Sequence, residues 1–594
     1  MTNWTVTRIV NPDEELFEIT IADYLKNSPL YNQRLPKDFD IDALCDRDML
    51  RRFVEAQSQK WHRLIQRFGN EEAAFEAVVK EYNKLLDNGK GMSYILNNGL
   101  NIQGIKIAVV QYRPQYDDPE SEFQQLYLQN RFSVVRQMRY STAPQDCGRE
   151  LDLCILINGL PVITAELKNE QTGQNYAHAI HQYRHDRNPQ NRMLKSCLVH
   201  FAVDNNYAFM TTQLNGEKTR FLPFNINSTN PAVEGKYPTY YLWEEIWQAD
   251  SLLNILQHFI KQYKERDRKT GKEKKVTVFP RFHQLRAVRN LCRWVRESGA
   301  GNNYLIEHSA GSGKTKSMAW LAHQLANMTD RDLNPIFDSI IMVTDRIVLN
   351  ANMADDVNNF ETVVGTVKDI RRGAKKLAEA INDGNRIIVS TIQKFGFALD
   401  SLKREQKRKY AIIIDEAHTA IGNESAKDLV NALSTDEELR QYAEEFGADD
   451  YSSDMDAMLA FLQAMRQEMS HISYFAFTAT PKDKTYALFG KKTANGDNVA
   501  HDYYTMKQAI EEKFILDVLQ NYTTYDTMYQ FVEKGKAKPG MIEGVAEPEE
   551  KYEEKKSIRL IMQALNKDPY NMEKKARVML RALKKMPFDK VVEI

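Results

Sequence analysis

The sequence contains few cysteines, and their spacing excludes two kinds of small scaffold. Its 594 residues include five of them, with no CxxC pair and no Cys/His spacing typical of zinc ligands. They are Cys45, Cys147, Cys154, Cys197 and Cys292. The pattern excludes a disulfide-stapled domain and a zinc domain. It fits the reducing cytosol, so we expect a cytoplasmic protein.

Long apolar runs and an excess of one charge are also absent. No segment approaches the roughly 20 apolar residues that a membrane-spanning helix needs, and the N-terminal MTNWTVTRIV lacks a signal-peptide pattern. We therefore expect no membrane association. The 80 basic and 81 acidic residues give a formal net charge of -1. This balance excludes recognition of nucleic acid by overall charge, although local patches of Lys and Arg can still bind phosphates.

A glycine-rich loop, HSAGSGKT, spans residues 308–315 between a strand-like run and an amphipathic pattern. A phosphate-binding loop needs glycines because its backbone must curl until successive N–H groups face the anion. The helix that follows adds partial positive charge. That helix is predicted by apolar residues at helical spacing, namely Met318, Leu321, Leu325 and Met328. The motif therefore predicts a binding site for the phosphates of ATP.

The residues of this loop have separate expected roles. Lys314 should reach the β- and γ-phosphates, and the hydroxyl of Thr315 should coordinate Mg²⁺. Position 308 departs from the full pattern, which asks for glycine where this chain has His308. The nucleotide-binding residues expected here are Gly311, Ser312, Gly313, Lys314 and Thr315.

A second nucleotide motif, DEAH, follows the apolar run AIII at residues 415–418. The carboxyl end of a buried parallel strand is where α/β sheets bind ligands, so Asp415 is expected to hold Mg²⁺ through water. Glu416 is expected to be catalytic, because it can orient and deprotonate the attacking water. His418 either couples this site to the motif FTATP, which ends at Pro481, or is a hydrogen-bonded structural histidine.

A separate group of candidate residues lies in the N-terminal third. Asp152 opens the strand-like run DLCILI, Asn158-Gly159 marks a turn, and PVITAELK follows, which predicts a hairpin. Side chains alternate along a strand, so Glu166 and Lys168 should share one face. A loop from Asn158 to Leu160 places Asp152 opposite Glu166, with Cβ atoms roughly 5 Å apart. Two carboxylates so close repel each other unless a cation lies between them.

Two carboxylates and a main-chain oxygen form a suitable site for Mg²⁺, which can activate water and stabilise a pentavalent phosphate. Asp152 and Glu166 are the expected metal ligands, and both are expected to be catalytic together with Lys168, which would position or activate the nucleophile. The alternative is an exposed strand with an i, i+2 ion pair. Charge placed within an apolar hairpin is costly, and this favours the site.

The order of these motifs resembles known families. The pattern D-(x)13-E-x-K after a hairpin resembles the PD-(D/E)xK nuclease core. Gln284 in FPRFHQLRAV, whose amide can face an adenine edge, precedes HSAGSGKT, VTDR and TIQKF in the order of superfamily 2 helicase motifs. From about residue 10 to about residue 530 the chain resembles the restriction and motor (R) subunit of type I restriction-modification enzymes.

That resemblance implies ATP and Mg²⁺ as cofactors. It also implies translocation and cutting of double-stranded DNA, in a complex with methyltransferase and specificity subunits. Such nucleases often add an acid from an earlier helix, and Glu18, beside a stripe of Phe17, Ile21 and Leu25, is either that acid or a solvated residue. On a predicted helix, Tyr183, flanked by Gln182 and Arg184, either belongs to a Gln/Tyr element or is a core aromatic.

We therefore expect an α/β chain with a PD-(D/E)xK domain at 1–260 and a charged linker at 261–275. A RecA-like superfamily 2 domain should follow at 276–505, and an incomplete second RecA-like lobe should begin at 506–594. The basic stretch KREQKRK (403–409) either contacts phosphates or is solvated surface. Two other functions stay open: a DEAH-type helicase with a non-catalytic N-terminal binding module, and a non-enzymatic scaffold.

Overall fold

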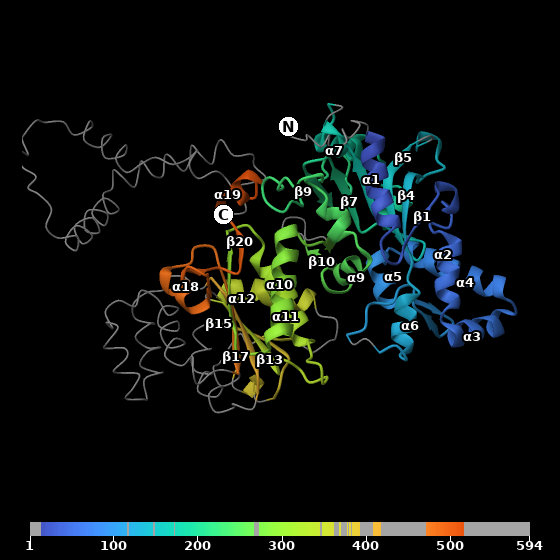
Figure 1. Ribbon diagram of the computed structural model, residues 1–594. Helices are drawn as coiled ribbons and strands as arrows, with labels where there is room; N and C mark the ends of the chain where they lie inside the picture. The colour runs from blue at the N-terminus through green and yellow to red at the C-terminus, as the bar shows by residue number, and fades with distance from the viewer. Residues whose placement is uncertain are drawn as a thin grey trace, which may run out of the picture. The chain divides into compact units, whose positions relative to one another are not determined.

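The computed structural model describes most of the first five hundred residues (Figure 1). The described residues are 14–115, 118–146, 149–170, 173–266, 273–344, 347–360, 367–369, 377, 379–381, 383–391, 408–416 and 471–515. The chain divides into two units after Leu516, and all described residues belong to the first. Among them no helix is long and apolar enough to span a bilayer, and Cys45, Cys154, Cys197 and Cys292 form no disulfide.

The N-terminal part is built on a seven-stranded mixed sheet with the order β1-β4-β5-β6-β7-β8-β9. Its strands are β1 (Tyr31–Arg34), β4 (Phe132–Arg139), β5 (Glu150–Ile157), β6 (Leu160–Leu167), β7 (Val199–Val203), β8 (Ala208–Thr211) and β9 (Leu222–Pro223). The β1–β4 and β6–β7 pairs are parallel and the others are antiparallel. Every residue of β6 is buried, which places this strand at the centre of the core.

Helices cover this sheet because their apolar faces need burial. On α1 (Glu14–Lys26) the predicted stripe of Phe17, Ile21 and Leu25 is fully buried, which confirms it. The helix α7 (Tyr176–His185) contains the segment predicted to be helical, and it contacts β6 and β7. The other elements of this part are α2 (Arg47–Glu55), α3 (Ser58–Phe68), α4 (Glu71–Asp87), α5 (Met92–Asn98), β2 (Leu100–Ile102), β3 (Ile105–Ile107), α6 (Glu122–Leu128), α8 (Arg192–Ser196), the π-helical turn η4 (Leu242–Ile246) and α9 (Ala249–His258).

The predicted hairpin is present as β5 and β6, but its register is reached in an unexpected way. Its turn has two residues, Asn158 and Gly159, both with positive φ (47° and 81°), as in a type I′ turn. A β-bulge between Ile155 and Leu156 then shifts the pairing by one residue. Beyond the bulge Leu153 pairs with Ala165, and these two residues are the chain neighbours of Asp152 and Glu166.

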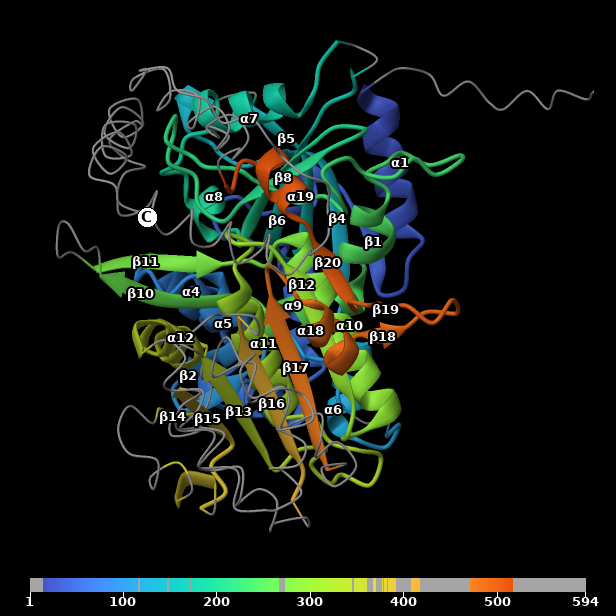
Figure 2. The same cartoon turned by 90° about the vertical axis from the view of Figure 1, so that its left-hand side faces the viewer.

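The charged stretch 261–275, predicted to be a linker, has regular structure where it is described. The strands β10 (Lys261–Arg266) and β11 (Glu273–Val278) pair as an antiparallel ribbon, visible in Figure 2. Alternating positions place Tyr263, Val276 and Val278 on one face of the ribbon. On the opposite, more polar face Gln262 donates a hydrogen bond to the Thr277 hydroxyl at 3.1 Å. Period-two alternation within a strongly charged segment is the signal that composition alone hides.

The second part contains a seven-stranded sheet in which all pairs are parallel, with the order β14-β15-β13-β16-β17-β12-β20 (Figure 2). The strands are β12 (Asn303–His308), β13 (Ser339–Thr344), β14 (Val367–Asp369), β15 (Ile387–Thr391), β16 (Tyr410–Asp415), β17 (Ile472–Thr478) and β20 (Asp502–Tyr504). The central strands β13, β15, β16 and β17 are buried along their whole length, which explains why they read as continuous apolar runs.

Helices flank this parallel sheet. They are α10 (Phe282–Ser298), α11 (Lys314–Ala326), α12 (Ile347–Asn359), α18 (Asp483–Phe489) and α19 (Met506–Glu511). A small ribbon of β18 (Lys491–Lys492) and β19 (Asn498–Val499) follows α18. The predicted helix after the glycine-rich loop is α11, and Met318, Leu321 and Leu325 are fully buried in it. The described fold is therefore mixed α/β, as predicted.

Several sequence motifs lie outside the described residues. They are His418, the second half of VTDR (345–346), most of TIQKF (392–395), most of KREQKRK (403–407) and all residues after 515.

Candidate functional site

The three nuclease candidates meet at one end of the β5–β6 hairpin. The Oδ2 atom of Asp152 accepts a hydrogen bond from the main-chain N–H of Leu167 at 2.7 Å. The Nζ atom of Lys168 lies 3.7 Å from the same oxygen. Glu166 follows Ala165, the strand partner of Leu153, and the charges of Asp152 and Lys168 both act on its carboxyl group, so the structure brings all three predicted side chains together.

Glu166 is fully buried and is paired with an arginine that sequence reasoning missed. Its Oε1 atom lies 2.6 Å from Nε of Arg187, and its Oε2 atom is buried without a hydrogen-bond partner among the described residues. Burial and, to a smaller extent, the nearby charge of Asp152 raise the pKa of Glu166 to about 8, against the opposing effects of Arg187 and Lys168. A buried carboxylate oxygen with no partner is a natural position for a cation.

Arg187 reaches the site from the turn that follows α7. Its Nη2 atom donates to the main-chain oxygen of Glu150 at 2.6 Å, and its guanidinium carbon lies 5.5 Å from the centre of the Tyr140 ring. Desolvation lowers the pKa of this guanidinium, but the charge and hydrogen bond of Glu166 together with Tyr140 and Tyr183 outweigh it, and the pKa is raised. A single arginine after a helix forms no recognisable sequence pattern. Its contact with Glu166 arises from the packing of α7 on β6, which the sequence alone does not reveal.

Glu18 is buried, so the interpretation as a solvated surface residue is wrong. Its Oε1 atom lies 2.6 Å from Nε of Arg136, and its Oε2 atom accepts from Nε2 of Gln137 at 2.6 Å. Burial raises the pKa of Glu18, and the charge of Asp152 contributes in the same direction. Glu18 therefore lies within electrostatic reach of the nuclease candidates, but both of its oxygens are already bonded.

Tyr183 belongs to a buried hydrogen-bonded chain behind the site. Its hydroxyl lies 2.8 Å from Oγ1 of Thr164, which lies 2.7 Å from Nδ1 of His200. Burial lowers the pKa of His200 to about 4, so this histidine is neutral near pH 7. Tyr183 is thus a bonded core aromatic that packs against the strand bearing Glu166. Its neighbour Arg184 instead donates to the main-chain oxygen of Thr219.

The nuclease candidates fit a hard divalent cation with a small number of protein ligands. Within the part of the chain that the structure describes, no group of three or more His, Cys, Asp or Glu side chains is arranged to hold a metal. Asp152 and Glu166 supply carboxylate oxygens, which Mg²⁺ prefers, and Mg²⁺ commonly keeps several waters or substrate oxygens. The unpartnered Oε2 of Glu166 is the observation that supports this fit.

The glycine-rich loop has the backbone that its sequence predicts. Gly311 and Gly313 have φ values of 74° and 78°, which glycine adopts without strain. A Cβ atom at Gly313 would lie 2.6 Å from Nε2 of Gln284. Lys314 is 2.8 Å from Oε1 of Glu416 and donates to the main-chain oxygen of His308 at 3.3 Å. The two expected ATPase residues therefore touch each other in the structure.

Side chains from the segment FPRFHQLRAV bind the carbonyl oxygens of this loop. Gln284 donates to the oxygens of Ser312 and Gly313 at 3.2 and 3.1 Å, and its own Oε1 accepts from the main-chain N–H of Arg281. Arg281 donates to the oxygen of Gly311 at 3.0 Å. With its carbonyl groups held on this side, the loop is free to direct N–H groups at an anion. The amide of Gln284 is thus bonded to the loop, and its contact with adenine stays a prediction.

His308, the departure from the loop pattern, makes a structural contact. It is fully buried, and its Nε2 lies 2.8 Å from Oδ1 of Asp502 on β20. Arg286 binds both oxygens of Asp502 at 2.9 and 3.0 Å. The histidine therefore joins the start of the loop to the edge strand of its sheet. Its partner lies 194 residues away in the sequence, so no local pattern predicts the contact.

The two strand ends beside the loop carry the remaining candidates. Asp415 ends β16 and Thr478 ends β17, and both side chains are buried. These strands are parallel neighbours, with Asp415 opposite Phe477, so the residues lie at the same edge of the sheet. Asp415 therefore lies at the carboxyl end of a buried parallel strand, and its approach to Thr315 and Mg²⁺ stays a prediction.

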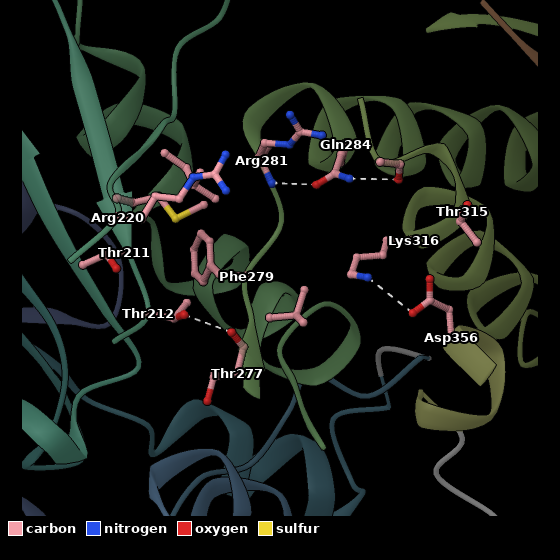
Figure 3. Close-up of a pocket in the computed structure, with 14 residues that line it drawn as sticks. Thr211, Thr212, Arg220, Thr277, Phe279, Arg281, Gln284, Thr315, Lys316 and Asp356 are labelled. Carbon is pink, nitrogen blue, oxygen red and sulfur yellow. Dashed lines mark hydrogen bonds and ion pairs between the residues drawn. The ribbon is translucent and has the colours of Figure 1, made fainter. Parts of the chain in front are cut away.

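A cavity of about 500 Å³ opens next to the loop (Figure 3). One wall comes from the parallel-sheet part and includes Phe279, Gln284, Gly313, Thr315, Lys316 and Asp356, and the other comes from β8, β9 and Arg220. Lys316 lies 3.3 Å from Asp356, and Thr212 donates to the main-chain oxygen of Thr277 at 2.9 Å. The cavity therefore combines an aromatic ring, cations and hydroxyl groups beside the predicted phosphate site.

Two family models match adjacent parts of the chain. Residues 31–219 match the N terminus of the type I restriction enzyme R protein, and residues 283–555 match the SWI2/SNF2 ATPase. The first match contains the nuclease candidates, and the second contains the glycine-rich loop and DEAH.

Curated relatives agree with these matches. The endonuclease subunit of type I restriction enzyme SauCOLORF180P from Staphylococcus aureus is 24% identical over 430 residues, which are 69% of this chain and 39% of the relative. The endonuclease subunit of HindI from Haemophilus influenzae is 20% identical over 450 residues, 72% of this chain and 37% of the relative. The chain thus spans about two fifths of the length of such relatives.

A solved structure of a nuclease-deletion mutant of the Type ISP restriction-modification enzyme LlaGI, with a DNA substrate mimic, is 16% identical. The match covers 42% of this chain and 22% of the LlaGI chain. Its TM-score of 0.24 is too low to establish a shared fold. The assignment therefore depends on the family models and the curated relatives. Together these matches support the resemblance of the chain to the R (endonuclease) subunits of type I restriction enzymes.

Proposed function

We propose that this chain hydrolyses ATP to move double-stranded DNA and cuts that DNA with a separate magnesium-dependent site, as the restriction subunit of a type I complex. The observation that carries the proposal is the convergence of Asp152, Glu166 and Lys168 at one end of a hairpin, in a chain that also carries the Lys314–Glu416 pair. Its partners would be the methyltransferase and specificity subunits and the DNA, in the cytoplasm.

The nuclease site supports hydrolysis of a phosphodiester. Asp152 and Glu166 would hold Mg²⁺, which supplies Lewis acidity to the phosphate and lowers the pKa of a bound water. The main-chain N–H of Leu167 fixes the carboxylate of Asp152. Lys168 lies beside that carboxylate, where its ammonium group can orient the nucleophile and offset the charge that develops on the phosphate.

The order of elements supports a nuclease core of the PD-(D/E)xK type for residues 1–260. A helix, α1, precedes the meander β4-β5-β6, and α7 then leads to β7, which is parallel to β6. Asp152 lies on β5 and Glu166 on β6, the last two strands of the meander. This arrangement places a buried acid, Glu18, on the preceding helix.

The second site supports ATP hydrolysis in a RecA-like domain at residues 276–505. The loop from Gly311 to Thr315 would hold the phosphates, with Thr315 and Asp415 near the Mg²⁺. Lys314 lies 2.8 Å from Oε1 of Glu416 in the structure. A γ-phosphate would take over the ammonium group of Lys314 and release Glu416 to orient water. The neighbouring cavity has room for the rest of the nucleotide, with Phe279 available to stack on a base.

The nuclease assignment is tested by plasmid cleavage with the assembled complex. Lys168→Ala should abolish cutting and leave ATP hydrolysis within about twofold, because the loop at residues 308–315 is untouched. Lys195→Ala, at an exposed lysine of the same domain, serves as the matched control and should cut normally. Cutting retained by Lys168→Ala would favour the alternative of a DEAH-type helicase with a non-catalytic N-terminal module.

The motor assignment is tested by calorimetric titration of the chain with ATP and Mg²⁺. Lys314→Ala should weaken binding by at least about tenfold, because it removes the cation expected at the β- and γ-phosphates. Lys492→Ala, on the exposed strand β18, is the control. Absence of ATP binding in the unmodified chain would favour a non-enzymatic scaffold.

A further inference from the structure

Arg187 is a buried cation of the nuclease site to which the proposed reaction assigns no role. Its side chain is almost fully buried, 2.6 Å from Oε1 of Glu166, and it is bonded to the main chain of Glu150. The ring of Tyr140 lies beside it. Because these contacts come from two strands and a loop, the positive charge is fixed in place next to an expected metal ligand.

The formal charges of the four ionisable side chains at the site sum to zero when all are ionised. Asp152 and Glu166 carry two negative charges, and Lys168 and Arg187 carry two positive charges. A divalent cation added to this group leaves a net charge of about +2 in a largely buried place, which is unfavourable. Phosphate oxygens of DNA are the anionic ligands that would offset this excess.

We propose that Arg187 weakens metal binding at Asp152 and Glu166 until a DNA phosphate enters the site. The chain would then bind the metal tightly only together with its DNA substrate. The cation alone would not activate the nuclease site. This inference rests on the proposed nuclease function of the same residues. It assigns to Arg187 a positioning role that acts through Glu166.

The sign of this effect does not depend on the protonation state of Glu166. If the carboxylate is ionised, the divalent cation adds two positive charges beside Arg187. If it is protonated, exchange of the proton for the cation still adds one. In both cases the fixed guanidinium opposes the metal, and removal of its charge favours it.

The test is a titration of the nucleotide-free, full-length chain with Mn²⁺, followed by calorimetry and by the electron paramagnetic resonance of free Mn²⁺. Arg187→Gln keeps a donor for Glu166 but removes the charge, and it should bind Mn²⁺ at least about tenfold more tightly than the unmodified chain without DNA. Arg187→Lys keeps the charge and loses the two-pronged contact, and it should stay within about threefold.

A purely structural role for Arg187 predicts a different pattern, because both substitutions would then weaken binding. Arg184→Gln is the matched control: it removes an arginine of α7 that bonds only the main chain of Thr219 among its described contacts, and it should leave Mn²⁺ binding unchanged. Equal or weaker Mn²⁺ binding by Arg187→Gln, or an equal gain in Arg187→Lys, overturns the inference.

A second measurement keeps the inference testable if Arg187→Gln does not fold. Addition of a short phosphorothioate duplex to the unmodified chain should tighten Mn²⁺ binding by at least about tenfold, because the backbone anions offset Arg187. No change on adding the duplex overturns the inference. Asp152→Asn separates the inference about Arg187 from the proposed nuclease function. If Asp152→Asn binds Mn²⁺ as tightly as the unmodified chain, the metal does not bind at the proposed site and the nuclease function fails too. The same holds if neither protein binds Mn²⁺.

Discussion

The buried histidine behind the nuclease site predicts that this part of the fold loses stability in mild acid. His200 is buried, with Nδ1 2.7 Å from Oγ1 of Thr164, and burial lowers its pKa from 6.5 to about 4. Between these values the unfolded chain binds a proton that the folded chain does not. Stability is therefore complete above pH 6.5 and falls as the pH drops towards 4.

The size of the effect follows from the shift. One pKa unit corresponds to about 1.4 kcal/mol, so His200 should cost the fold about 2 kcal/mol at pH 5 and about 3 kcal/mol at pH 4. His200→Gln removes the titrating ring and keeps a polar group near Thr164. It should remove this part of the acid dependence, so its loss of stability relative to the unmodified chain should be largest near neutral pH and should shrink as the pH falls.

Hydrogen exchange read by mass spectrometry suits this test, because it reports local opening in a chain too large for a two-state transition. The opening free energy of peptides that cover β7 should fall between pH 7.5 and pH 5 by about 2 kcal/mol more in the unmodified chain than in His200→Gln. His178→Gln, at an exposed histidine on α7, is the control. Parallel pH profiles for the unmodified chain and His200→Gln would refute the reasoning.

Two further substitutions test the turn and the ATPase pair. Gly159→Ala should lower the stability of the N-terminal part by on the order of 3 kcal/mol, because φ is positive and a Cβ would lie 2.2 Å from the main-chain oxygen of Asp46. Gly104→Ala, with φ of 86° and no neighbour within 4 Å, should cost only about 1 kcal/mol, and equal losses in thermal unfolding would contradict the account. Glu416→Gln should slow ATP hydrolysis by at least about a hundredfold, since it removes the base. ATP should bind as well or better, because Lys314 loses its competing partner; weaker binding in a titration would show that the pair does not compete with nucleotide.

The sequence predicted the features that depend on local periodicity. The apolar stripe of α1, the hairpin around Asn158-Gly159 and the helix after the glycine-rich loop all follow from spacing within a few turns of chain. The proximity of Asp152 and Glu166 was also predicted, although the hairpin has a bulge and a shorter turn than expected. A bulge has no reliable signature in one sequence. The turn is one residue shorter than predicted and the bulge adds one residue, so the two differences cancel in the register.

Features that depend on packing between distant segments were not predictable. Arg187 meets Glu166 only because α7 packs on β6, and His308 meets Asp502 only because β20 joins the sheet beside β12. The burial of Glu18 likewise depends on how α1 lies against β4. The pairing of β10 and β11 was not predicted, because the high charge of the segment hides the alternation of its side chains.

The most direct test of the account is whether the two phosphate sites can be lost independently. Purified full-length protein would be titrated with ATP and, separately, with Mn²⁺ in the presence of a phosphorothioate duplex, for Lys314→Ala and for Asp152→Asn. We expect Lys314→Ala to lose ATP binding and keep Mn²⁺ binding. Asp152→Asn should keep ATP binding and lose Mn²⁺ binding. Loss of both ligands in either variant, or of neither, would contradict the claim that one chain carries two separate sites.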